Sequence, residues 1–162
     1  MPFHCPTCGG EHEGLPDLAF DLPLAVQQIP EAEWGARVGL VGDDLCILDD
    51  EHFFIRGIIE VPIHDHPERF GLNVWVSQEQ DNFWTYVDHY ESSEIGPFFG
   101  WLSNALDYGG EPVINLKTMA HFRGGGLRPS IEIEPTGHPL ARDQRDGITL
   151  DRAWEMVHHY LG

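Results

Sequence analysis

Residues 52–61 read HFFIRGIIEV, and this segment is the strongest indication of the fold class in the sequence. It is rich in β-branched and aromatic residues, which favour an extended strand. Apolar side chains recur at every second position, namely Phe53, Ile55, Ile59 and Val61. Arg56 and Glu60 share the opposite face. This two-residue period predicts a strand with one packed face and one partly wet face.

Further strands are predicted on both sides of this stretch. Cys46-Ile47-Leu48 precedes it, and the turn formers Asp49-Asp50 between the two runs predict a hairpin. A second alternation after it predicts another strand, over Phe70, Leu72, Val74 and Val76. Residues 113–122 and 128–134 predict two more strands, joined by a turn at the glycines 124–126. These glycines are not a phosphate loop, because no helix and no Lys-Ser/Thr pair follow them.

Helical patterns are interspersed with the strands. Pro30 suits the first turn of a short helix that reaches about Val38 and ends at Gly39 or Gly42. Residues 77–80 read SQEQ, which fits a capping box for a helix near 78–90. Thr149 caps a C-terminal helix whose apolar stripe is Leu150, Ala153, Trp154, Val157 and Leu161.

These patterns together predict an α+β fold. Because the strands are joined mainly by hairpins, we expect a single domain over 1–162 with a mainly antiparallel sheet. Its sheet core is expected over 44–134, with packed helices near 78–90 and over 149–161. Residues 1–14 are predicted to form a zinc-knuckle-like N-terminal loop. Residues 96–102 are predicted to form a buried aromatic turn, and core positions are predicted for Trp75, Trp84, Trp101 and Trp154.

The composition excludes several classes of protein. The chain has 162 residues, 41% of them hydrophobic, and no apolar run approaches the roughly 20 residues of a membrane-spanning helix. Its 27 acidic and 9 basic residues give a net charge of −18, which repels nucleic-acid phosphates. We therefore expect a soluble protein with neither nucleic-acid nor membrane partners. The N-terminus carries no secretion signal, so a cytoplasmic location is expected by default.

The motif Cys5-Pro6-Thr7-Cys8-Gly9 is the strongest chemical signal in the sequence. Two thiols three positions apart, followed by a glycine, can wrap a Zn²⁺ ion. Cys46 would supply a third thiolate and His12 the fourth ligand, with His4 as the competing candidate. A closed shell of three thiolates and one imidazole leaves no position for water, so the predicted role of the zinc is structural.

The cysteines have other interpretations. In one, all three are unligated and Cys46 is a small core residue. In another, Cys5 and Cys8 form a redox pair, although such pairs usually lie at a strand-to-helix turn. A disulfide framework is not expected, because the cysteines are odd in number. A catalytic metal would need an open position and a nearby base, for which Glu11 and Glu13 are the local candidates.

Several other polar residues are candidates for a site. His64 and His66 lack a third ligand at a recognisable spacing and are interpreted as an exposed loop pair. Arg142 and Arg145 follow His138 and suggest either internal pairing with Glu132 and Glu134 or the capture of a carboxylate ligand. An enzyme would draw its pocket from Asp49, Arg56, Arg128, His138 and Arg145. Recognised catalytic and nucleotide-binding motifs are missing from the sequence.

Many short motifs, spread over nearly the whole chain, occur together in a familiar order. They include CPTCG at 5–9, HEGLP at 12–16, DLC at 44–46, FFIRG at 53–57, VWVS at 74–77, NF at 82–83, PFFGWL at 97–102, LKT at 116–118, RP at 128–129, HPLA at 138–141 and QRDGI at 144–148. Their order and spacing resemble those of the bacterial family known as domain of unknown function 2199. The resemblance implies no activity, substrate or cofactor. It does imply that Cys5, Cys8, His12 and Cys46 belong to the family pattern and that the 64–66 loop does not.

The expected function is that of a binding or accessory module stabilised by zinc, with no chemistry of its own. The first alternative is an enzyme that uses the polar pocket named above. The second is an acidic inhibitor or immunity-type protein that binds a basic protein partner by charge complementarity. The acidic excess is also consistent with simple solubility or a salty cytoplasm. The oligomeric state is not predicted.

Overall fold

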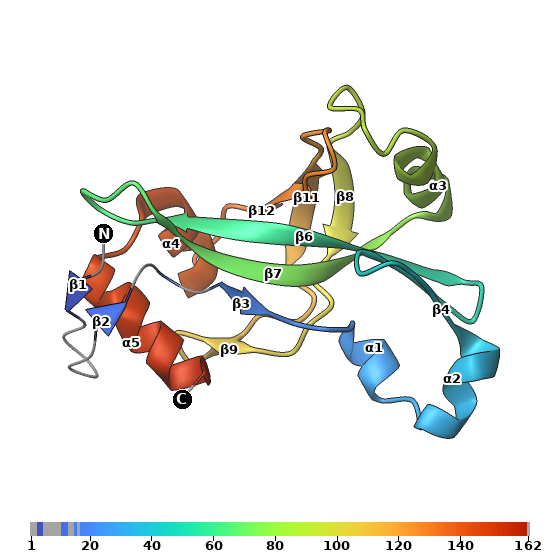
Figure 1. Cartoon of the computed structure of the whole chain (residues 1–162), viewed down its shortest axis with the longest axis horizontal. Helices are drawn as coiled ribbons and strands as arrows, with labels where there is room; N and C mark the ends of the chain where they lie inside the picture. Colours follow the sequence, from blue (N-terminus) through green and yellow to red (C-terminus); the bar gives the residue numbers. More distant parts are fainter. Residues whose placement is uncertain (1–2, 5–10, 13–14, 16, 162) are drawn as a thin grey trace.

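A computed structural model describes residues 3–4, 11–12, 15 and 17–161 of the chain (Figure 1). Its centre is a long antiparallel hairpin of β6 (His52–Pro62) and β7 (Arg69–Gln78), paired from Phe53 opposite Gln78 to Pro62 opposite Arg69. Every odd-numbered residue of β6 from 53 to 61 is buried, as predicted, but Phe54 and Arg56 on the opposite face are buried as well, so burial alternates only in the second half of the strand. This hairpin is the frame on which the other strands assemble.

The main sheet has eight strands, six of them in the order β3-β7-β6-β12-β11-β8, with β5 also pairing with β6 and β4 with β5. The remaining strands of this sheet are β3 (Leu18–Ala19), β4 (Val38–Val41), β5 (Leu45–Leu48), β8 (Phe98–Trp101), β11 (Lys117–His121) and β12 (Ser130–Ile133). Only the β3–β7 and β6–β12 pairings are parallel among the described strands. Two short hairpins lie outside this sheet, β1 (Phe3–His4) with β2 (Glu11–His12) and β9 (Asp107–Tyr108) with β10 (Glu111–Pro112). The predicted α+β fold with a mainly antiparallel sheet is confirmed.

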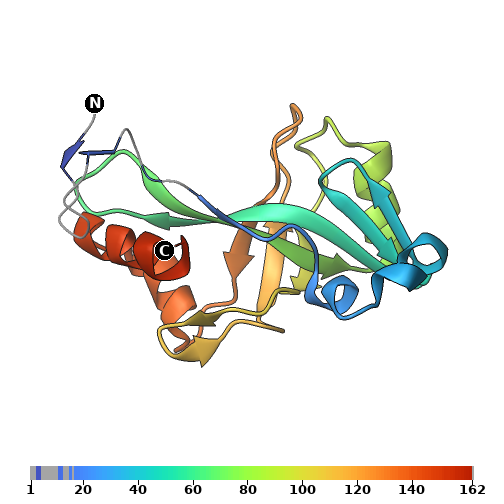
Figure 2. The same ribbon diagram turned by 60° about the horizontal axis from the view of Figure 1, so that its bottom comes forward.

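Five helices are found in the described part of the chain: α1 (Leu24–Gln27), α2 (Glu31–Arg37), α3 (Gln80–Asp88), α4 (Pro139–Asp146) and α5 (Leu150–Leu161). Figures 1 and 2 show α4 and α5 side by side at one end of the β6–β7 hairpin and α1 and α2 at the other. Thr149 caps α5 as predicted, because its hydroxyl accepts a hydrogen bond from the Arg152 amide at 3.2 Å. None of these helices is long and apolar enough to cross a lipid bilayer.

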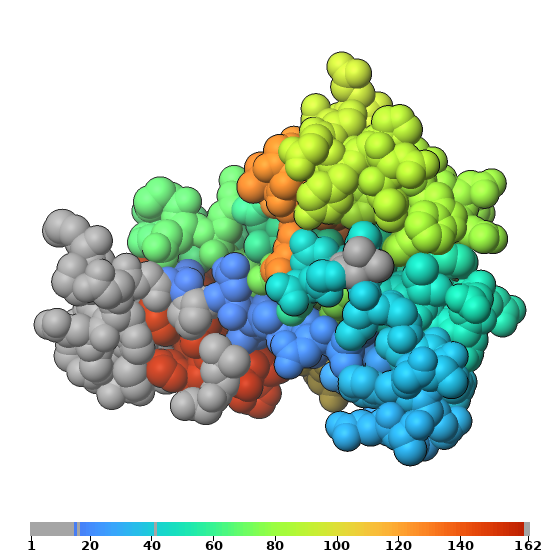
Figure 3. Space-filling view, turned by 45° about the vertical axis from the view of Figure 1, so that its right-hand side comes forward, coloured from blue at the N-terminus to red at the C-terminus, as the bar shows by residue number. Residues whose placement is uncertain are grey.

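Two clusters of buried side chains hold the sheet and helices together. The larger lies between the strands, α3, α4 and α5 and includes Phe70, Ile131, Leu140 and Trp154. The smaller consists of Val26, Ile29, Cys46, Leu48, Phe54 and Trp75, under α1. The turn at residues 124–126 reaches the segment after α3, where the Gly125 amide donates to the Glu91 carbonyl at 3.2 Å. In the space-filling view this orange turn lies against the yellow-green projection that contains α3 (Figure 3).

Several sequence predictions about local structure are wrong. Ser77 does not cap a helix: β7 continues to Gln78, α3 begins at Gln80, and the Ser77 hydroxyl accepts a hydrogen bond from the Trp101 amide instead. Residues 98–101 are not a buried turn but strand β8, because they pair with β11. The helix α2 is not ended by a glycine, since the chain enters β4 directly at Val38.

Two further corrections concern length and exposure. The strand predicted over 113–122 is shorter, because Asn115 adopts a left-handed conformation with φ of 65° and forces a turn before Lys117. Trp75 and Trp154 are buried as expected, but Trp84 and Trp101 are each 43% exposed. The predicted zinc-knuckle-like loop lies largely outside the described residues.

Candidate binding face

The strands β8, β11 and β12 turn one face toward the core and the other toward solvent. Their inward residues are buried and small or apolar: Gly100, Thr118, Ala120, Ile131 and Ile133. Their outward residues form what we call the outer strand face: Phe99, Trp101, Lys117, Met119, His121 and Glu132. The described helices leave these side chains exposed or only partly covered.

Two large aromatic side chains lie next to each other on the outer strand face. Phe99 is 41% and Trp101 43% exposed, and their rings meet edge to face with centroids 5.1 Å apart. In the strand register Met119 is opposite Phe99 and Lys117 is opposite Trp101, with the Lys117 ammonium 6.0 Å from the Trp101 ring centroid. The face therefore presents a contiguous strip of aromatic, thioether and methylene surface.

The end of β7 covers the free edge of β8. The Trp101 amide donates to the Ser77 hydroxyl at 3.0 Å, and the Gln78 side-chain amide donates to the Phe99 carbonyl at 3.3 Å. Gly100 packs directly on the Ser77 carbonyl, which leaves no room for a side chain. Because these backbone groups are already paired, a partner would bind the face of the sheet and not extend its edge.

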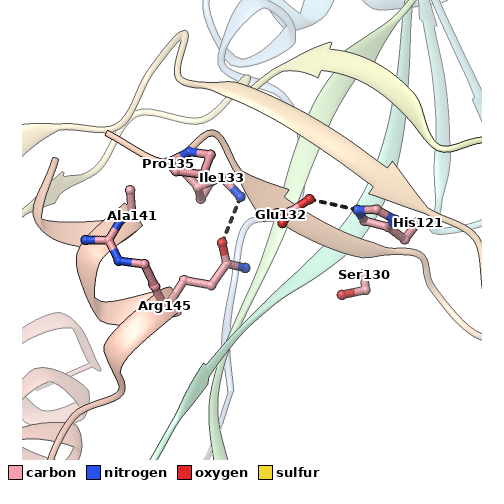
Figure 4. A pocket seen from close by; sticks show the side chains of 8 residues that line it. His121, Ser130, Glu132, Ile133, Pro135, Ala141 and Arg145 are labelled. Carbon is pink, nitrogen blue, oxygen red and sulfur yellow. Dashed lines mark hydrogen bonds and ion pairs between the residues drawn. The ribbon is translucent and has the colours of Figure 1, made fainter. Parts of the chain in front are cut away.

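An open pocket of about 360 Å³ borders the outer strand face on the side of α4 (Figure 4). It is lined by His121, Ser130, Glu132, Ile133, Pro135, Ala141, Gln144 and Arg145. His121 Nε2 lies 3.0 Å from Glu132 Oε1. The Gln144 side chain connects α4 to β12, because it accepts a hydrogen bond from the Ile133 amide and donates one to the Ile131 carbonyl, both at 2.7 Å. A smaller hollow of about 240 Å³ shares Glu132 and Pro135 with this pocket and extends over Phe99 and Met119.

The polar groups of the pocket do not form a catalytic triad. Ser130 is opposite His121 in the strand register. In the described part of the chain, however, no hydrogen bond joins the Ser130 hydroxyl to the imidazole, which bonds to Glu132 instead. Arg145 pairs with the neighbouring Asp146 at 3.5 Å. A nucleophile needs a base within hydrogen-bonding distance, so this arrangement suits binding better than acyl transfer.

The structure brings together two of the five residues predicted for an enzyme pocket. Arg56 is buried beside Trp75, with its guanidinium carbon 5.6 Å from the ring centroid, and donates to the Phe20 carbonyl at 2.8 Å. Burial is the main cause that lowers the pKa of Arg56, and the nearby positive charge of Arg128 lowers it further. Arg128 pairs with Asp44 at 3.0 Å. These contacts tie the β4–β5 turn and the residues before α1 to the central hairpin.

Of the other three predicted residues, Asp49 lies near β5, whereas His138 and Arg145 lie at opposite ends of α4. Asp49 follows β5 and makes two hydrogen bonds to Arg37, at 2.8 and 2.9 Å, which lower the pKa of Asp49. His138 caps α4 by accepting from the Leu140 amide at 3.0 Å, and its other ring nitrogen lies 3.0 Å from the Pro112 carbonyl oxygen. Arg145 lines the pocket of Figure 4. His64 Nε2 lies 2.9 Å from the carbonyl oxygen of Asp146 at the end of α4, and His66 Nδ1 accepts from the Glu68 amide at 3.1 Å.

Only two of the four predicted metal ligands, His12 and Cys46, are among the described residues. Cys5 and Cys8 lie outside the described residues. The backbones of His4 and His12 belong to the antiparallel pair β1–β2, which lies at the α5 end of the molecule (Figure 1). Cys46 is fully buried in the smaller core cluster at the other end, where burial raises the pKa of its thiol to about 11. No group of three or more potential ligands is found among the described residues.

Residues 4–148 match the model of a family described as an uncharacterized protein conserved in bacteria (DUF2199). The chain belongs to the DUF2199 family. This confirms the resemblance found in the sequence. The matched part of the DUF2199 chain contains the whole outer strand face and α4, whereas α5 begins after it. No curated protein and no solved structure matches the chain.

Sequence reasoning missed the outer strand face. The signal was present, because Phe99 and Trp101 flank Gly100 with the two-residue period of a strand. It was interpreted as a buried turn because aromatic residues are usually buried.

Proposed function

We propose that this DUF2199 protein is a binding module that recognises a protein partner through the outer strand face. The observation that carries the proposal is the side-by-side exposure of Phe99 and Trp101, with Met119 next to them. Contiguous exposed apolar surface of this kind marks interaction sites. Aromatic residues and methionine are also the residue types enriched at the centres of protein interfaces.

The charge of the chain favours a basic partner. The net charge is −18, and Glu132 and Glu134 border the apolar strip along β12. Lys117 is the only lysine in the sequence. A partner with an apolar patch surrounded by lysine or arginine would match this surface in apolar character and in the sign of its charge, and opposite charges would accelerate the encounter.

A defined peptide pair tests this proposal. One peptide alternates leucine with lysine and the other alternates leucine with glutamate, and binding to the full chain is followed by fluorescence anisotropy. We expect the lysine peptide to bind at low salt, to weaken as salt rises, and to shift backbone NMR signals of β8, β11 and β12. Equal binding of the glutamate peptide, or shifts confined to other elements, would contradict the proposal.

Matched variants locate the interaction. Phe99→Ser and Met119→Ser should each weaken binding at least about tenfold, because central interface residues carry most of the affinity. Trp84→Ser is the control, since Trp84 is as exposed as Trp101 but lies on α3.

We also propose a structural zinc site at the N-terminal hairpin. The antiparallel pairing of β1 with β2 supports it, because these strands bring the two ends of the segment that carries Cys5 and Cys8 together. His4 and His12 belong to the same strands and are the candidate remaining ligands. Cys46 is left out of this proposed site, because it lies in the smaller core cluster under α1, at the other end of the molecule from β1 and β2.

Elemental analysis of reduced protein tests the zinc site. About one equivalent of zinc is expected, lost in Cys5→Ser and Cys8→Ser and retained in Cys46→Ser. Less than about half an equivalent in freshly purified protein would remove the site.

A further inference from the structure

The smaller hollow on the outer strand face, of about 240 Å³, has the size of a single side chain. We call it the anchor hollow, and it is lined by Phe99, Lys117, Thr118, Met119, Glu132, Glu134 and Pro135. Its volume lies below the roughly 300 Å³ at which sites for small-molecule ligands begin, and above the roughly 150 Å³ of a cavity that holds a benzene ring. One aromatic or branched aliphatic group would therefore fill it.

Cross-strand pairing builds the apolar part of the anchor hollow. Met119 on β11 is opposite Phe99 on β8 and opposite Glu132 on β12, so these three residues form one row across the outer strand face. Pro135, just beyond β12, adds a third apolar lining residue. The hydroxyl of Thr118 already donates to a backbone carbonyl of β8 at 2.9 Å. This part of the lining therefore suits an apolar group, which requires no hydrogen bond.

Two carboxylates border the anchor hollow on the side of β12. Glu132 and Glu134 are two positions apart, which separates their Cα atoms by about 7 Å in an extended chain. The side chain of Glu132 is 56% exposed and uses only Oε1 for its contact with His121. Glu134 is exposed, and its carboxylate makes no hydrogen bond or ion pair with any residue that the structure describes. Both side chains can therefore pair with a cation on a ligand.

Lys117 is the only basic residue among the described residues that line the anchor hollow. Its ammonium lies 6.0 Å from the ring centroid of Trp101, which does not line the hollow. Two carboxylates and one ammonium leave an excess of negative charge, so the hollow favours a cation over an anion. Because all three groups are exposed to water, we expect this preference to be moderate and to weaken as salt rises.

We propose that the anchor hollow binds an apolar group joined by a short chain to a cation. In the partner, this is an aromatic or branched aliphatic side chain next to a lysine or arginine. The apolar group lies against Phe99, Met119 and Pro135. The cation pairs with Glu132 and Glu134. This inference rests on the protein-binding function proposed above, and it adds the residue types that the partner must present.

Three small compounds of nearly equal shape test the proposal: phenethylamine as the cation, phenethyl alcohol as the neutral form and phenylacetate as the anion. They are titrated into the full chain labelled with ¹⁵N and with ¹³C in the methionine methyl groups. We expect phenethylamine to give saturable shifts of the Met119 methyl signal and of the Glu132 and Glu134 amide signals. Phenethyl alcohol should bind at least about threefold and phenylacetate at least about tenfold more weakly. No saturable binding of phenethylamine up to about 50 mM, equal binding of phenylacetate, or shifts confined to other elements would overturn the proposal.

Neutral variants of the two carboxylates separate charge from shape. Glu132→Gln combined with Glu134→Gln should weaken phenethylamine binding at least about fivefold and leave phenethyl alcohol binding within about twofold. The control combines Glu31→Gln on α2 with Glu155→Gln on α5, which removes the same charge from exposed residues outside the hollow. It should leave both affinities within about twofold. Unchanged phenethylamine affinity in the first variant would contradict the pairing.

The lysine peptide distinguishes a failure of this inference from a failure of the proposed function. If the peptide binds to β8, β11 and β12 but phenethylamine does not bind, the anchor hollow is wrong and the binding face stands. If phenethylamine binds in the hollow but the peptide does not bind, the ligand class of the hollow is confirmed and the protein-binding function is refuted. Where both bind, the peptide should displace phenethylamine, and simultaneous binding would contradict the assignment of the hollow to the partner.

Discussion

Replacing Asp143 by alanine should lower the free energy of unfolding by about 1 to 4 kcal/mol, because this carboxylate joins three elements of the fold. Asp143 lies on α4, with a side chain only 12% exposed. One of its oxygens accepts a hydrogen bond from the Tyr108 hydroxyl of β9 at 2.6 Å. Its two oxygens also lie 2.7 and 3.1 Å from the guanidinium of Arg152 on α5.

The expected magnitude comes from the two partners separately. Tyr108 is completely buried, so losing its acceptor leaves an unsatisfied hydroxyl, which costs about 1 to 3 kcal/mol. The side chain of Arg152 is 42% exposed and can turn to water, so losing the ion pair adds only about 0 to 1 kcal/mol. Tyr108→Phe should cost less, about 1 kcal/mol, because Asp143 keeps its bonds to Arg152.

Urea denaturation of the two single variants and the double variant measures the coupling. If the orphaned hydroxyl is the main cause, the double variant should be no less stable than Asp143→Ala alone, with a coupling of about 1 to 2 kcal/mol. Arg145→Ala, which breaks an exposed ion pair with Asp146, is the control and should change stability by less than about 0.5 kcal/mol. Strict additivity of the two single effects would refute the reasoning.

Three other predictions follow from close packing, burial and charge. Gly100→Ala should destabilise the chain by ~2 kcal/mol in urea denaturation, because a methyl group would collide with the Ser77 carbonyl. Burial raises the pKa of the Cys46 thiol to about 11. When the folded chain is treated with an alkylating reagent at pH 8, peptide mapping should therefore find Cys46 unmodified until urea is added. Rapid alkylation of Cys46 in the folded chain would contradict this prediction. Arg37 lowers the pKa of Asp49 below its usual 3.8, so their pairing stabilises the fold above that pH and is lost as pH falls through the lowered pKa. The stability of Arg37→Ala should therefore approach that of the unchanged chain in acid. A stability difference between the two chains that stays the same in acid would contradict this prediction.

The central hairpin could be predicted from the sequence because its signal is local. Residues 53–61 are rich in β-branched and aromatic residues, and a strand places Phe53, Ile55, Ile59 and Val61 on one face. The stripe of α5 and its Thr149 cap were predictable for the same reason, since both depend on residues within a few positions of each other.

The errors arose where a local pattern fitted two structures equally well. The SQEQ pattern at 77–80 fits a capping box, but Ser77 is opposite Phe54 on β6, and this long-range pairing keeps it in the strand. The run at 98–101 became a strand because β11 supplied a partner strand for it. Trp84 and Trp101 occupy periodic positions that suit a core, yet each lies on a surface that no described element covers.

Composition and periodicity alone were sufficient for the fold class, the acidic surface and the long strands, because each depends on counts of residue types or on neighbours along the chain. The positions of the candidate sites were not accessible in this way. Gln144 bonding to β12, the end of β7 covering β8, and Asp143 linking α4 to α5 and β9 all join residues far apart in sequence or on different elements. Which polar atoms find partners, and which aromatic rings stay exposed, is therefore settled only when the strands and helices pack together.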